Sequence, residues 1–78
     1  MVKFEKLECV VLAHDMSKYG LRAGDMGTVV EIYTGDGLEV EFVRGSGVTQ
    51  ALLTLTAQDV RKIGPFDLPA TRRLAEVK

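Results

Sequence analysis

Residues 22–42 read RAGDMGTVVEIYTGDGLEVEF, and this stretch decides the fold. A Gly-Asp pair at 24–25 opens it with a turn signal, because glycine adopts backbone angles that other residues resist. Residues 26–34 and 38–43 then alternate between apolar and polar side chains, which is typical of half-buried β-strands. The Gly-Asp-Gly sequence at 35–37 separates the two runs. The stretch therefore predicts a β-hairpin.

The register of this hairpin is predicted by keeping one of its faces apolar. A three-residue loop at 35–37 does so, with Gly37 at the left-handed position that closes such a loop. This register places Glu31 directly opposite Glu41, and Tyr33 opposite Glu39 on the same face. The pairs expected on the apolar face are Thr34 with Leu38, Ile32 with Val40, and Val30 with Phe42.

Three more strands are expected around the hairpin. Residues 7–13 contain the apolar run CVVLA, which suits a strand covered on both sides, and residues 48–55 are β-branched and apolar. The Thr56-x-x-Asp59 spacing predicts a short helical turn, and residues 60–63 a closing strand. Five short strands with tight turns indicate an all-β fold, a small antiparallel SH3-like barrel over residues 1–64.

Residues 65–78 are expected to form a short C-terminal helix after the Gly64-Pro65 break. Asp67 can cap this helix, and Pro69 is tolerated in its first turn. Its apolar side chains form one narrow stripe, and a helix this short needs a surface to pack on. We therefore expect the tail to self-associate or to pack on its own barrel. The candidate self-association residues are Leu68, Ala70, Leu74 and Val77.

Composition sets limits on function. The 78 residues hold ten Lys and Arg against eleven Asp and Glu, a net charge of −1, which argues against a nucleic-acid-binding protein. One cysteine allows neither an internal disulfide nor a cysteine-based metal site, and suits a reducing compartment. We expect a cytoplasmic protein that spans no membrane, uses no cofactor and pairs with a second copy, because so small a domain is only marginally stable.

The stretches GDMGTVVEIY, LEVEFV and ALLTLTAQDVR resemble the pattern of an uncharacterised family of very short bacterial proteins, over residues 7–63. That resemblance implies a bacterial protein and the same small fold, and it implies no chemistry. A looser resemblance, through Gly24-Asp25-x-Gly27-x-Val29, is to the KOW motif of SH3-like barrels in ribosomal and transcription-elongation proteins. It implies the alternative function, an RNA-binding module.

The acidic face of the hairpin is the most unusual local feature, because like charges opposite each other destabilise a strand pair. It is either a solvated face screened by salt and by nearby cations, a docking face for a basic partner, or a site for a divalent cation. The loop at 14–22 is a second candidate surface, although Tyr19 and Leu21 could instead fill the mouth of the barrel. The candidate docking residues are Glu31, Tyr33, Glu39, Glu41, Tyr19 and Arg22.

An enzyme is not expected. Cys9 and His14 are the residue types of a nucleophile and a base, but along a straight strand about 16 Å would separate them. The sequence therefore predicts a non-enzymatic protein-interaction or assembly module with an unidentified protein partner.

Overall fold

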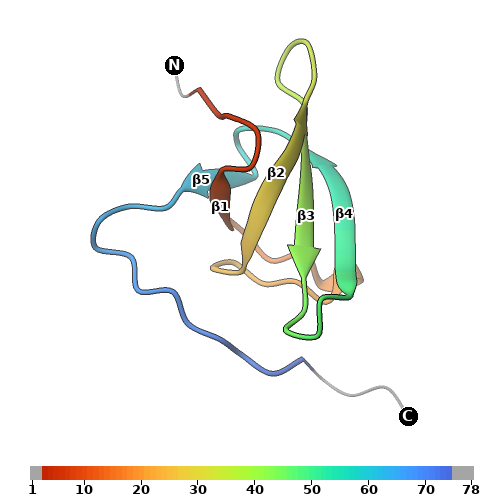
Figure 1. The fold of residues 1–78 in the computed structure, drawn as a ribbon, viewed down its shortest axis with the longest axis vertical. Coiled ribbons are helices and arrows are strands. Elements are labelled where there is room, and N and C mark those ends of the chain that lie inside the picture. Colours follow the sequence, from red (N-terminus) through yellow and green to blue (C-terminus); the bar gives the residue numbers. More distant parts are fainter. Residues whose placement is uncertain (1–2, 75–78) are drawn as a thin grey trace.

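The computed structural model describes residues 3–74, and five strands form one antiparallel sheet in the order β4-β3-β2-β1-β5 (Figure 1). The expected strands are confirmed, some of them shorter than predicted. Their bounds are β1 (Cys9–Leu12), β2 (Met26–Ile32), β3 (Leu38–Val43), β4 (Thr49–Leu55) and β5 (Val60–Lys62).

The sheet is open rather than closed. Strands β4 and β5 are its two edges, and in residues 3–74 no ladder joins them. The all-β class is confirmed, whereas the closed SH3-like barrel is not. The strands still curl around one core, because each of the five contributes buried side chains to the same cluster. Phe4 and Leu21 join this cluster from outside the strands, together with Val10, Leu12, Val29, Leu38, Val40, Phe42, Ala51, Leu55 and Val60.

The register of the β2–β3 hairpin differs from the predicted one. Val29 pairs with Val40 and Glu31 with Glu39, so Val30 is an extra residue, a β-bulge. The bulge turns Val29, which is fully buried, toward the core in place of Val30. The prediction that Glu31 lies opposite Glu41 is therefore wrong. The loop is also shifted by one residue, because the Tyr33 amide donates to the Gly37 carbonyl and the bond encloses residues 34–36 instead of 35–37.

The loop at 14–22 folds onto the core. It contains a short 3₁₀ helix, η1 (Ser17–Tyr19), and a bridge between Met16 and Leu21. Leu21 is buried in the core, and Tyr19 packs against it. The expectation that Tyr19 and Leu21 fill the end of the core is confirmed.

The turn before β5 forms as the Thr-x-x-Asp spacing predicts. The Asp59 carboxylate accepts from the Thr56 amide at 2.9 Å, and the Thr56 hydroxyl accepts from the Gln58 amide at 3.2 Å. The turn stays a single turn and does not extend into a helix.

The predicted C-terminal helix is wrong over the residues that can be compared. Residues 65–74 contain no helix; they leave β5, swing outward and pass back below the sheet (Figure 1). Asp67, the expected helix cap, instead accepts from the Gly64 amide and from Arg61, which lie before it in the chain. Pro69 also disfavours helical angles at the residue before it. Val77, one of the expected stripe residues, lies outside the described residues.

Within residues 3–74, no helix has the length and apolar content needed to cross a membrane.

Candidate functional site: a cleft between the Gly-Asp turn and the tail

The Gly-Asp turn before β2 is tightly anchored. The Asp25 carboxylate accepts from the Arg22 amide at 2.8 Å, and the Asp25 amide donates to the Arg22 carbonyl at 3.0 Å. Gly24 has a φ of +97°, which favours glycine. Both residues also bond to the Leu12 backbone at 2.8 Å. The turn therefore holds the Asp25 carboxylate at a fixed position at the end of the sheet.

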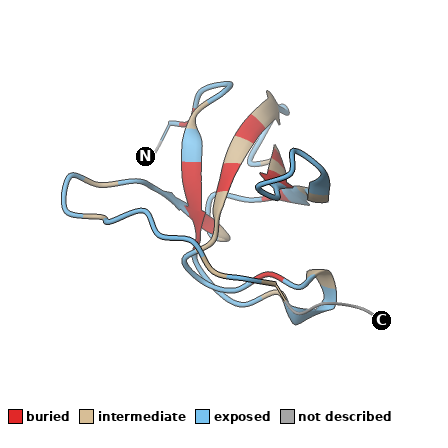
Figure 2. Ribbon diagram, turned by 60° about the horizontal axis from the view of Figure 1, so that its bottom comes forward, coloured by how far each residue is buried: buried red, intermediate tan, exposed pale blue. Residues whose placement is uncertain are grey.

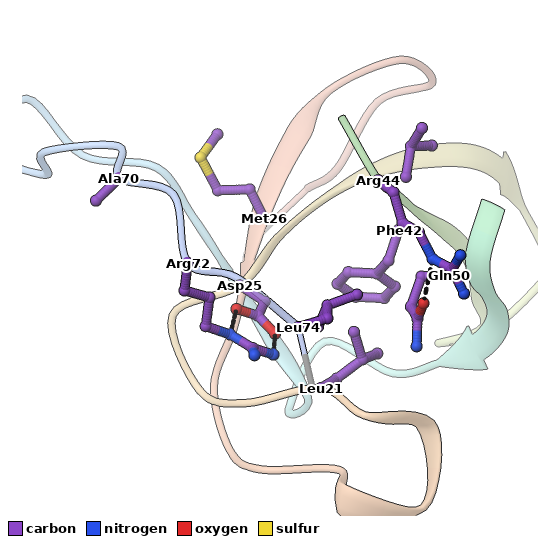
Figure 3. Close-up of a pocket in the computed structure, with 10 residues that line it drawn as sticks. Leu21, Asp25, Met26, Phe42, Arg44, Gln50, Ala70, Arg72 and Leu74 are labelled. Atoms are coloured by element: carbon purple, nitrogen blue, oxygen red, sulfur yellow. Dashed lines mark hydrogen bonds and ion pairs between the residues drawn. The ribbon is translucent and has the colours of Figure 1, made fainter. Parts of the chain in front are cut away.

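Arg72, from the tail, binds this carboxylate as a fork. Its Nε donates to Asp25 Oδ1 at 2.8 Å and its Nη2 to Asp25 Oδ2 at 2.6 Å (Figure 3). The same Nη2 donates to the Gly20 carbonyl at 2.9 Å. The hydrogen bonds from Arg72 lower the pKa of Asp25, and the Asp25 carboxylate raises the pKa of Arg72. The pair is thus fully ionised at neutral pH.

The loop at 14–22 positions the Gly20 carbonyl. Gly20 ends η1 with a φ of +71°. Gln50 on β4 donates to the Tyr19 carbonyl at 3.0 Å and accepts from Arg44 at 2.7 Å. This chain of bonds ties the loop to β4, so the two acceptors of the Arg72 guanidinium belong to one rigid surface.

A cleft lies beside the ion pair, where the tail crosses the end of the sheet (Figure 3). Its volume is about 210 Å³. The sheet and the loop supply one wall, and the tail supplies the other with Ala70, Arg72 and Leu74. The residues of the first wall are Leu21, Asp25, Met26, Phe42, Val43, Arg44 and Gln50. We call this hollow the Asp25 cleft.

The tail meets the cleft with every second residue. Arg72 and Leu74 are half-buried, whereas Thr71 and Arg73 are exposed. An alternation of buried and exposed side chains every two residues is typical of an extended chain. The helical stripe predicted for Ala70 and Leu74 is therefore replaced by an extended segment in which Ala70, Arg72 and Leu74 all line the cleft.

A second ion pair fastens the start of the tail. Arg61 on β5 donates to both oxygens of Asp67, at 2.8 and 3.0 Å, and the Gly64 amide donates to Asp67 Oδ2 at 2.6 Å. The hydrogen bonds from Arg61 lower the pKa of Asp67 to about 2. The described tail is thus held at Asp67 and again at Arg72.

The apolar side chains on either side of Asp67 are uncovered. Phe66 is 99% exposed and Leu68 88% exposed, which are the highest values among the large apolar side chains described. The tail is mostly pale blue, the colour of exposed residues, in Figure 2. These side chains contribute nothing to the core of a single copy.

The acidic face forms, but its charges have partners. Thr54 donates to Glu39 at 2.6 Å, Thr49 donates to Glu41 at 2.5 Å, and Lys6 lies 3.2 Å from Glu31. The Tyr33 hydroxyl also donates to Glu39, at 3.3 Å. Hydroxyls from β4 and one lysine thus offset the repulsion between the carboxylates. Each of the three carboxylates has a donor, so this face needs a basic partner less than the sequence suggests.

The predicted docking residues lie in two places. Glu31, Tyr33 and Glu39 are near the hairpin loop, where β2 ends. Tyr19 and Arg22 precede the start of β2, which is seven residues long. At the rise of an extended strand, about 20 Å separates its two ends. The structure therefore does not bring the six residues together, and only Tyr19 and Arg22 neighbour the Asp25 cleft.

His14 bonds to an acid rather than to a nucleophile. Its Nε2 lies 2.8 Å from Asp59 Oδ1, and its Nδ1 lies 3.2 Å from the Asp15 carbonyl. The hydrogen bond to Asp59 raises the pKa of His14. Cys9 is exposed on β1, where it pairs with Thr28. In residues 3–74, no group of three or more His, Cys, Asp and Glu side chains is arranged to hold a metal ion.

Sequence reasoning noticed both partners of the cleft separately and did not join them. The sequence predicts Asp25 only as part of a turn, and it places Arg72 only within the expected C-terminal helix. The two lie 47 positions apart, so no local pattern could pair them. The sequence did contain one signal. Ala70 and Leu74 are four residues apart, which fits a helix, but Ala70, Arg72 and Leu74 are also spaced by two, which fits an extended chain.

The chain belongs to the family described as a domain of unknown function (DUF4926), whose model matches residues 6–62. The match confirms the expectation that the chain belongs to an uncharacterised family. The match contains Asp25 and all five strands, and it ends at the last residue of β5. Arg72 and Leu74 therefore lie after the matched region. No curated protein and no solved structure matches the chain.

Proposed function

We propose that this protein is a non-enzymatic protein-interaction module, and that its binding site is the Asp25 cleft. Its ligand is an extended segment that presents an arginine and, two residues later, an apolar side chain. The observation that carries the proposal is the Arg72–Asp25 fork, with Leu74 in the adjoining cleft. The chain's own tail supports this ligand class, because Arg72 bonds to Asp25 and Leu74, two residues later, lines the cleft.

Arginine suits the Asp25 site better than lysine does. The guanidinium is planar and donates in a fork that matches both oxygens of a carboxylate, whereas an ammonium is a point charge. Here the fork meets Asp25 and the same group also reaches the Gly20 carbonyl. Three bonds in fixed directions select for side-chain shape as well as for charge.

The dimensions of the cleft favour a peptide side chain over a small-molecule ligand. Pockets for small molecules are usually about 300–1,000 Å³ in volume, and the Asp25 cleft is about 210 Å³. Leu21 and Phe42 supply apolar surface on the wall that faces Leu74 of the tail, and the half-buried Asp25 supplies one negative charge. This combination of one anchor charge and one apolar neighbour is typical of peptide recognition on a rigid scaffold.

The test uses a peptide and the full-length chain. In the Arg72→Ala variant the Asp25 carboxylate has lost its partner, and a labelled peptide with the sequence FDLPATRRLAEVK is added in trans. Fluorescence anisotropy should show saturable binding. Replacing the peptide arginine that corresponds to Arg72 with alanine should weaken binding at least tenfold, and replacing the one that corresponds to Arg73 should not.

Equal binding of the two altered peptides would contradict the proposal, and so would binding that survives a further Asp25→Asn substitution in the protein. The same assay with single-stranded RNA addresses the alternative. Affinity for RNA at low salt that falls steeply as salt rises would favour the KOW-like module instead. A cytoplasmic location belongs to the proposal and is supported by the single cysteine of the chain.

A further inference from the structure

We propose that two copies of this chain exchange tails, so that Arg72 and Leu74 of each copy occupy the Asp25 cleft of the other. This inference rests on the proposed function, because it assumes that the cleft receives an extended arginine-bearing segment. It goes further by naming a second copy as the partner that supplies the segment.

The segment that would carry the exchange is already free of the sheet. Between Asp67 and Arg72, within the described residues, no hydrogen bond joins the tail to the rest of the molecule. Asp67 fixes where the tail leaves β5, and the four residues after it connect that point to the fork at Arg72. A change of backbone angles in this connection redirects the tail without breaking any strand.

Exchange preserves the contacts of the cleft. The Arg72 guanidinium finds the same two Asp25 oxygens and the same Gly20 carbonyl whether the cleft belongs to its own chain or to a second one. Swapping of an identical element between copies is a common route to dimers for this reason. Association therefore requires no new complementary surface.

Phe66 and Leu68 provide the reason for exchange to be favoured. In a single copy Phe66 and Leu68, on either side of Asp67, are 99% and 88% exposed, so neither side chain packs on the sheet. In an exchanged pair the two connections run between the copies, where these side chains gain apolar neighbours. Burial of apolar surface is the main favourable term in association.

Opposite charge reversals test the exchange directly. Asp25→Arg and Arg72→Asp are made in separate full-length chains, so each variant has like charges at the cleft both within one copy and between identical copies. Only a mixed pair joins opposite charges at both clefts. We expect each variant alone to be monomeric by native mass spectrometry, and the mixture to form a one-to-one heterodimer.

The unaltered chain and two point variants complete the test. We expect a monomer–dimer equilibrium for the unaltered chain. The dissociation constant of the dimer should rise at least tenfold in Phe66→Ser and should be unchanged in Arg73→Ala. If Asp25→Arg does not fold by circular dichroism, Asp25→Asn is mixed with Arg72→Ala, since asparagine keeps an oxygen for the Arg22 amide. One chain then keeps the tail and the other keeps the cleft.

Two results overturn the exchange. One is the absence of mixed dimers between folded complementary variants at concentrations up to about 1 mM, the range of the weakest specific complexes. The other is a homodimer that persists unchanged in Arg72→Ala, which would place the interface elsewhere. If the labelled tail peptide still binds the Arg72→Ala protein in either case, the proposed function stands and only the exchange is lost.

Discussion

Asp25 and Arg72 lie 47 positions apart in the chain and are joined by two parallel bonds, at 2.8 and 2.6 Å. Their side chains are only 19% and 28% exposed. Exposed ion pairs contribute little because water and salt screen them, whereas a shielded fork with fixed geometry is stronger and more specific. This pair therefore fixes where the described part of the tail crosses the end of the sheet.

Replacing Arg72 with alanine should release the tail and lower stability, because the Asp25 carboxylate and the Gly20 carbonyl both lose their donor. The matched control is Arg73→Ala, which removes the same charge from the next residue. Arg73 is exposed and makes no ion pair within residues 3–74. Urea unfolding and the NMR chemical shifts of the tail amides should both respond to the first change only. Equal responses would mean that charge alone, and not the fork, holds the tail.

Arg72→Lys should fail to restore the attachment, although it keeps the charge. One ammonium cannot reach both Asp25 oxygens and the Gly20 carbonyl with the geometry of the guanidinium. The NMR chemical shifts of the tail amides in Arg72→Lys should therefore be close to those in Arg72→Ala. Shifts in the lysine variant that match the unaltered chain would show that the site recognises charge without shape.

Gly27→Ala should damage the core. A Cβ atom at Gly27 would lie 2.7 Å from Val40 Cγ1 and 2.9 Å from Phe42 Cε1, distances that force a rearrangement. Overpacking of this kind costs about 1–3 kcal/mol. Gly45→Ala is the control, because nothing lies within 4 Å of a Cβ atom there. It should change the free energy of unfolding by less than about 0.5 kcal/mol. Equal melting temperatures for the two variants would argue against the close packing of Gly27 on Val40 and Phe42.

His14 should make stability depend on pH. Its bond to Asp59 raises its pKa in the folded protein above the ordinary histidine value of 6.5. A raised folded pKa means that the contribution is fully present below 6.5 and is lost as pH rises through the folded value. Because the chain has one histidine, NMR can follow this titration alone. Asp59→Asn should return the pKa toward 6.5, and an unchanged midpoint in that variant would show that the bond does not form.

The strands were predictable because their signal is local. Alternation and turn residues are read over a few positions, and the ends found by the structure differ little from those expected. The register was not predictable in the same way. The bulge at Val30 reverses which side chains face the core, and both Val29 and Val30 are equally apolar. Which of the two valines faces the core is decided only by the pairing of Val29 with Val40 in the folded sheet.

The tail could not be predicted because its structure depends on distant partners. Asp67 has the right position to cap a helix, but Arg61 and Gly64 take both of its oxygens. Arg72 has Glu76 four positions later in the sequence, at helical spacing, but its guanidinium binds Asp25, which is 47 positions away. The same applies to the acidic face, where Thr49 and Thr54 on β4 donate to carboxylates that look unpaired in the sequence of the hairpin.

The most direct test of the account is displacement of the tail from its own cleft in the unaltered protein. Unlabelled FDLPATRRLAEVK peptide is titrated into ¹⁵N-labelled chain, and the backbone amides are followed by NMR. We predict that the amides of Thr71 to Leu74 move toward the positions of free peptide, whereas the amides of Leu21, Arg22 and Asp25 stay nearly in place because the peptide restores the same contacts. Tail amides that stay in place at saturating peptide would contradict the account.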